Sequence, residues 1–140
     1  QIAGSEQNKT VIGLENISQE MSLLYDSVDI AQQARILVNT VNNTDSLRNA
    51  AILIKQLYKK GDLDALLKNG AQETAMGALS DEEVKKYIES QNNEWMKKLP
   101  DMMKNNTCFI AIGALHLAGE NGIISQLSNA GFKVKPYKSK

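Results

Sequence analysis

The chain has 140 residues, of which 42% are hydrophobic and 23% charged, so its length and composition predict one globular domain. Lysine plus arginine equals aspartate plus glutamate at 16 each, and this zero net charge argues against nucleic acid as a main partner. A single cysteine excludes an internal disulfide, and no apolar run approaches the ~20 residues that span a bilayer.

The first predicted element is a short buried strand over residues 10–14, where TVIGL gives an apolar run. Helical spacing then predicts a helical region over about residues 16–98, built from several amphipathic helices. Glycines mark the predicted ends of two of these helices, a long one that stops at Gly61 and a short one that stops at Gly70.

Residues 107–137 have the pattern of a strand, a helix and a second strand. CFIAIGAL is a continuous apolar run bounded by turn residues, the following helix is predicted to stop at Gly131, and FKVKPY is the second strand. We therefore expect an α/β fold, with a parallel or mixed sheet and a large helical insertion. Trp95 in the preceding helix and Cys108 in the apolar run are predicted core residues.

Three strands form a small sheet, which leaves two faces and two edges to be covered. The chain also begins with Gln1 rather than methionine. Together these features predict that residues 1–140 are the C-terminal part of a larger domain, whose upstream half would be a partner. Without that half, copies of the chain are expected to form a homo-oligomer through the exposed sheet edge.

Polar residues follow the predicted strands at the position where open parallel sheets gather ligands. Glu15 follows the first strand, and His116, the only histidine, follows the second. A carboxylate and an imidazole that meet there suit acid–base catalysis or a divalent metal. Glu120 begins the last predicted helix, whose N–H groups favour an anion. Asn92 is predicted to share a partly buried helix face with Trp95.

Each of these residues also has a structural interpretation. A histidine after a strand can be a hydrogen-bonded loop residue, and Glu15 and Glu120 can be acids that stabilise the start of a helix. One histidine and one carboxylate are also too few to complete a metal shell. Spacing alone therefore leaves both catalysis and simple packing open.

Four segments of the chain resemble, in the same order, motifs of the TraB/GumN family, and together they cover about residues 11–137. They are the Gly-Leu-Glu segment with Gly13 and Glu15, the LYKKGDLDALL stretch, the QNNEWM stretch with Asn92, and a C-terminal G-x-x-H motif from Gly113 to His116 that is followed by Gly119, Glu120 and Gly122. Gln91 stands where the family usually has arginine. A first G-x-x-H motif, usual upstream in the family, is absent.

The resemblance implies an activity that spacing does not. Family members and relatives include a metal-dependent peptidase, macrolide esterases and haem-binding lipoproteins, so it implies a peptidase-like hydrolase that uses manganese or a similar divalent metal. His116 and Glu15 would each be a metal ligand or a base, and Asn92 and Glu120 would orient the substrate or ligand. The alternatives are a non-catalytic module that binds a tetrapyrrole or another ligand, and a purely structural one. Because bacterial members often carry export signals, a periplasmic or cell-surface location is expected.

Overall fold

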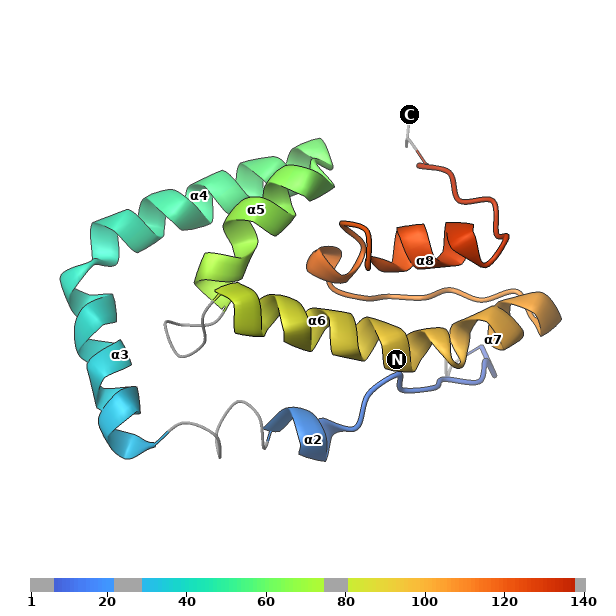
Figure 1. Cartoon of the computed structure of the whole chain (residues 1–140), viewed down its shortest axis with the longest axis horizontal. Helices are drawn as coiled ribbons and strands as arrows, with labels where there is room; N and C mark the ends of the chain where they lie inside the picture. The colour runs from blue at the N-terminus through green and yellow to red at the C-terminus, as the bar shows by residue number, and fades with distance from the viewer. Residues whose placement is uncertain (1–6, 22–28, 75–80, 138–140) are drawn as a thin grey trace.

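The computed structural model describes residues 7–21, 29–74 and 81–137, and this part of the chain is helical (Figure 1). Its helices, in chain order, are α2 (Ile17–Met21), α3 (Ile30–Asn42), α4 (Thr44–Lys60), α5 (Leu63–Thr74), α6 (Asp81–Met96), α7 (Leu99–Asn105), the 3₁₀ helix η2 (Ala114–His116) and α8 (Ile123–Asn129). None of the described helices is both long enough and apolar enough to cross a membrane.

The expected α/β fold is wrong, because the described residues contain no strand or sheet. The three predicted strand segments lie within this part of the chain, and no main-chain hydrogen bonds pair them with one another. Residues 107–113 instead form an irregular segment that leads from α7 back toward η2 (Figure 1). Ile110 and Ile112 of this segment pack against the buried helical core. The apolar run is therefore covered only in part, since helices cover Ile110 and Ile112 whereas Phe109 is 95% exposed.

Two local predictions are also wrong. The helix expected to stop at Gly70 continues to Thr74. Gly70 is buried, and a Cβ there would lie 3.0 Å from Cδ2 of Leu115, so the glycine lets α5 approach η2 closely. Cys108 was predicted in the core but is exposed, since no strand covers its segment, and its thiol lies 3.6 Å from the carbonyl oxygen of Met102.

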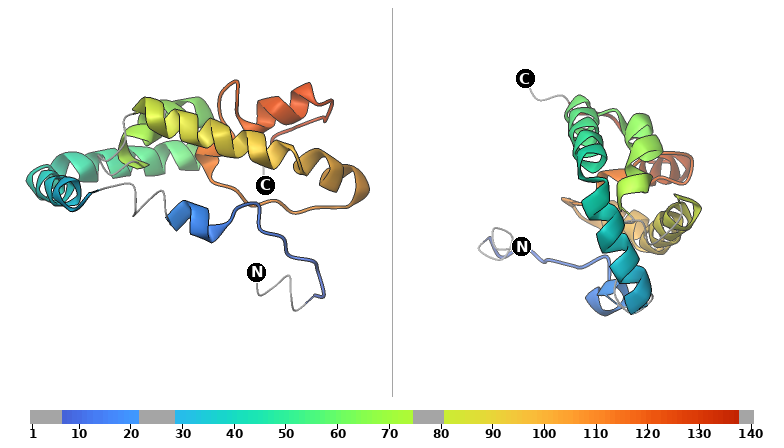
Figure 2. Two further views of the ribbon diagram at one scale, coloured as in Figure 1. Left: turned by 60° about the horizontal axis from the view of Figure 1, so that its bottom comes forward. Right: turned by 90° about the vertical axis from the view of Figure 1, so that its left-hand side faces the viewer.

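The buried core lies where α6, α7 and α8 meet, and Figure 2 shows α7 continuing the line of α6. Its central cluster is formed by Trp95, Leu99, Ile123 and Leu127. The prediction that Trp95 is a core residue is confirmed, because the ring is only 4% exposed. This cluster fixes α8 against α6, and with them the connecting loop that carries His116.

Helices α3 and α4 lie to one side of this core (Figures 1 and 2). α4 packs mainly against α5, and neither α3 nor α4 contains a buried residue. The predicted end of α4 at Gly61 is confirmed by a left-handed backbone with φ of 69°. Gly131, with φ of 89°, likewise follows the end of α8.

Candidate functional site

The side-chain amide of Asn92 joins α6 to the loop that carries His116. Asn92 is 1% exposed, and its Nδ2 donates hydrogen bonds to the main-chain carbonyl oxygens of His116 (3.2 Å) and Asn121 (2.9 Å). Its Oδ1 lies 2.9 Å from Nδ1 of His116. Both the nitrogen and the oxygen of the buried amide thus have hydrogen-bond partners, as buried polar groups require. The prediction that Asn92 shares a buried helix face with Trp95 is confirmed.

This network assigns the tautomer of His116. Carbonyl oxygens only accept hydrogen bonds, so the two carbonyls beside Asn92 fix its Nδ2 on their side and turn its Oδ1 toward the imidazole. An oxygen acceptor opposite Nδ1 places the proton on Nδ1, and the lone pair is then on Nε2. Nε2 has no hydrogen-bond partner among the described residues, so it can receive a proton or another ligand.

The surroundings of His116 favour its neutral form. The imidazole is half-buried, and the centroid of its ring lies 4.5 Å from that of Trp95, with the planes tilted by 36°. Burial lowers the pKa of His116 below its ordinary value of 6.5, because desolvation disfavours the charged form. At neutral pH the side chain is therefore an uncharged imidazole, held by Asn92 and the Trp95 ring.

Glu15 is also held by α6, through the residue next to Asn92. Nε2 of Gln91 donates a hydrogen bond to Oε1 of Glu15 (2.8 Å) and lies 2.9 Å from the hydroxyl oxygen of Tyr87. Consecutive helical residues point about 100° apart, so Glu15 and His116 lie against adjacent faces of α6. The predicted meeting of Glu15 and His116 at strand ends is wrong, because the described residues contain no sheet. Each of the two side chains instead contacts a residue of α6.

The glycines of the C-terminal motif shape the loop after His116. Gly119 has φ of 80°, a left-handed conformation that glycine adopts without strain. A Cβ at Gly122 would lie 2.3 Å from the carbonyl oxygen of Ala118, so only a hydrogen fits there. At the other two motif glycines, Gly13 and Gly113, a Cβ would have more room, because its nearest atoms would lie at 3.3 Å and 3.4 Å.

A cleft of about 150 Å³ lies beside Asn92, between α5, α6 and the loop after His116. Its lining combines apolar side chains, such as Leu115, with the charged side chains of Lys85, Glu89 and Glu120. Glu120 thus shares a cleft with Asn92, although it does not begin a helix as predicted, since α8 starts three residues later at Ile123. The volume of the cleft is comparable to that of one amino-acid side chain.

A divalent metal does not fit the described residues by themselves. Within residues 7–21, 29–74 and 81–137, no three histidine, cysteine, aspartate or glutamate side chains lie close enough together to hold a metal ion. His116 and Glu15 would supply two ligands, fewer than the three protein ligands usual in a catalytic zinc site. A metal at this place would need further ligands.

Sequence patterns missed several members of this site. In the sequence, Gln91 stands out only because the family usually has arginine at this place, yet its side-chain amide donates a hydrogen bond to Glu15. Tyr87 stands one turn before Gln91, and that i, i+4 spacing is the signal from which their contact could have been inferred. Lys85 and Glu89 have no comparable signal, because their place in the cleft depends on how α5 and the loop pack on α6.

Comparison with protein-family models matches residues 1–136 to the TraB/PrgY/gumN family. No curated protein and no solved structure is similar enough to the chain to count as a match. The matched range includes every residue of the Asn92–His116 network and the Gln91–Glu15 contact.

Proposed function

The chain belongs to the TraB/PrgY/gumN family. From that premise we propose that it is part of a peptidase-like hydrolase in which His116 acts as the general base. The observation that carries this proposal is a neutral imidazole whose orientation Asn92 fixes through Nδ1, while Nε2 has no hydrogen-bond partner among the described residues. A histidine that acts as a general base must be unprotonated at the working pH and oriented by a second group, and His116 meets both conditions.

In this proposal, Nε2 of His116 accepts a proton from the water that attacks the substrate. Oδ1 of Asn92 keeps the Nδ1–H in place and stabilises the ring while it is charged. The lowered pKa of His116 makes it a weaker base but increases the fraction in the reactive, unprotonated form at neutral pH. Asn92 is then a positioning residue, since it acts through the imidazole.

Glu15 and Glu120 have supporting roles in the proposal. Glu15, held by Gln91 on the neighbouring face of α6, is a second acid–base group or a metal ligand. Glu120 orients substrate from the lining of the cleft beside Asn92. Manganese or a similar divalent ion stays a proposed cofactor that needs ligands beyond the described ones, so the proton transfer at His116 is derived without it.

The cleft, whose lining includes Asn92 but not His116, is too small to enclose a large ligand such as a tetrapyrrole. Its volume of about 150 Å³ is below the range of about 300–1,000 Å³ that is typical of pockets for whole small molecules. A peptide or ester that places one side chain in the cleft, with its scissile bond outside, matches this volume better. This comparison favours a peptidase-like or esterase-like substrate.

The test is hydrolysis of a fluorogenic peptide library and of p-nitrophenyl acetate, each with manganese and with EDTA. We compare wild type with His116→Gln and, as a control on α6, with the exposed Asn93→Ala. His116→Gln is expected to lower kcat/KM at least about 100-fold. The wild-type rate is expected to rise with pH through an apparent pKa below 6.5.

Two results would overturn the proposal. One is a wild type that hydrolyses no probe under either metal condition, and the other is a His116→Gln variant with unchanged kcat/KM. In the first case, a haem titration would follow. A change of haem absorbance that disappears in His116→Gln would then favour the ligand-binding alternative, because a neutral imidazole is also a haem ligand.

A further inference from the structure

Helix α3 exposes a regular stripe of apolar side chains, which we call the α3 seam. It consists of Ile30, Ala34, Leu37 and Val41. The exposed fractions of the three large side chains are 85%, 65% and 65%, in chain order. Steps of four, three and four residues keep the four side chains within an arc of about 60° around the helix axis. This spacing is typical of a helix face that packs against another helix.

The α3 seam faces away from the rest of the described chain. Gln32 and Ile36 are the half-buried residues of α3, and helical geometry places both on the side opposite the seam. An amphipathic surface helix normally turns its apolar stripe toward the core. Here the stripe points outward, so the folding of the described residues does not account for it.

The spacing of the seam is self-complementary. Read in either direction, its steps are four, three and four, so two antiparallel copies related by a two-fold axis place Ile30 opposite Val41 and Ala34 opposite Leu37. The small side chain of Ala34 leaves room for the larger Leu37 of the other copy, as knobs-into-holes packing requires.

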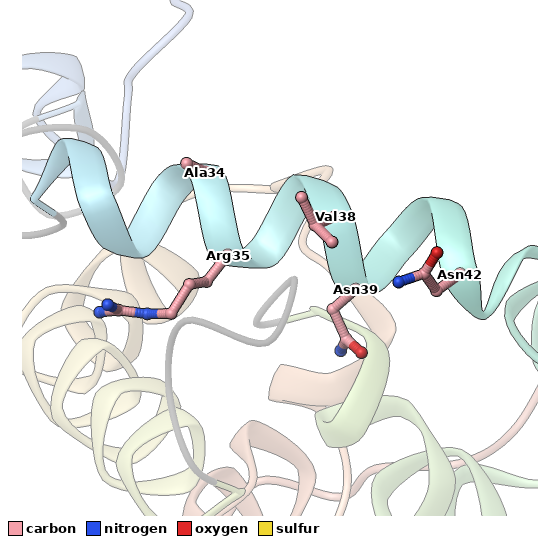
Figure 3. Close-up of a pocket in the computed structure, with 5 residues that line it drawn as sticks. All are labelled: Ala34, Arg35, Val38, Asn39 and Asn42. Carbon is pink, nitrogen blue, oxygen red and sulfur yellow. The ribbon is translucent and has the colours of Figure 1, made fainter.

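Charge also favours a second copy over a membrane surface. Arg35 is the only charged residue within α3, whereas helices that bind anionic lipids carry several lysines or arginines on the polar face. The flank of the seam carries this single arginine beside uncharged residues. Figure 3 shows Val38 near the seam residue Ala34, with Asn39 and Asn42 on the same helix, and the described lining of this open groove comes from α3 alone.

The exposed area is sufficient for such an interface. The three large side chains of the seam are 65% to 85% exposed. A standard interface takes about 800 Å² from each partner. Pairing of α3, a helix of 13 residues, would give an interface at the small end of the range.

From these observations we propose that the chain forms a two-fold symmetric dimer in which the α3 seams of two copies pack antiparallel. Because the contact is short, the dimer is weak, with a Kd on the order of 10 µM. The proposal does not depend on hydrolase activity, since α3 contributes no residue to the Asn92–His116 network.

Sedimentation velocity over a concentration series tests the proposal. The wild type is expected to pass from monomer to dimer, and Leu37→Glu to raise the Kd at least tenfold. Ile52→Glu on α4 is the matched control, because Ile52 is 50% exposed but lies outside the seam, and its Kd is expected to stay unchanged. Both residues are exposed, so both variants should fold, which Trp95 fluorescence verifies. A monomeric wild type at every concentration, or a dimer that Leu37→Glu leaves intact, overturns the proposal.

Cross-linking tests the antiparallel arrangement. In a Cys108→Ser background, Ile30→Cys and Val41→Cys chains are treated with a short thiol cross-linker, separately and as a mixture. The antiparallel dimer predicts efficient cross-links only in the mixture, where the two cysteines face each other. Cross-links in each variant alone, and none between the two, would instead indicate a parallel pair and overturn the proposed symmetry.

Discussion

Replacement of Asn92 by alanine is expected to be among the most destabilising single changes in this chain. The substitution removes three hydrogen bonds, two to carbonyl oxygens and one from Nδ1 of His116, at a site that is 1% exposed. At about 1 kcal/mol for each bond, the free energy of unfolding should fall by about 3 kcal/mol. The buried groups left without partners make this a lower bound, and it is a large share of the 5–15 kcal/mol typical of whole domains.

Urea unfolding followed by fluorescence measures this loss directly, since Trp95 is the only tryptophan and stacks on His116. With a slope of about 2 kcal/mol/M, the midpoint should fall by about 1.5 M. Asn93→Ala is the matched control, because Asn93 is exposed and accepts a 3.2 Å bond from Gln126, and it should cost less than about 0.5 kcal/mol. Equal losses in the two variants would refute the role given to the buried amide.

Three further predictions follow from the same site. Because burial lowers the pKa of His116 in the native state, the unfolded chain binds this proton more tightly. The free energy of unfolding should therefore decrease as pH falls below 6.5. Urea midpoints at about pH 7.5 and about pH 5.5 should show this decrease in wild type but not in His116→Gln. Asn92→Asp places a negative charge beside Nδ1, and an NMR titration of the single imidazole should give a higher pKa than in wild type; an unchanged value would mean that the two side chains are not in contact. Gly122→Ala should cost at least about 2 kcal/mol in urea unfolding, since its Cβ would meet a carbonyl oxygen at 2.3 Å. Gly61→Ala, with open space but φ of 69°, should cost only about 1 kcal/mol, and the reverse order would contradict the clash.

Much of the helical structure could be predicted from local sequence signals. The ends of α4 and α8 follow from Gly61 and Gly131, because a left-handed residue ends a helix whatever surrounds it. The placement of Asn92 and Trp95 on one buried face follows from the helical period. These features depend on residues within one or two turns, so the amino-acid sequence itself contains the information.

The wrong predictions concern features that depend on distant residues. CFIAIGAL has the composition of a central strand, but a strand also needs a neighbour to share main-chain hydrogen bonds, and here helices cover Ile110 and Ile112 instead. Gly70 looks like a helix stop, yet the approach of Leu115 gives it a packing role inside α5. Neither outcome can be inferred from residues nearby in the chain.

The candidate site divides in the same way. Residue types and spacing point to His116, Glu15 and Asn92 as candidate site residues, and helical spacing indicates an apolar stripe on α3. The contact between Asn92 and His116, the position of the imidazole lone pair and the outward direction of the α3 stripe come from the folded chain alone. A hydrogen bond between residues 24 positions apart, like the side on which a helix is covered, exists only after the chain has folded.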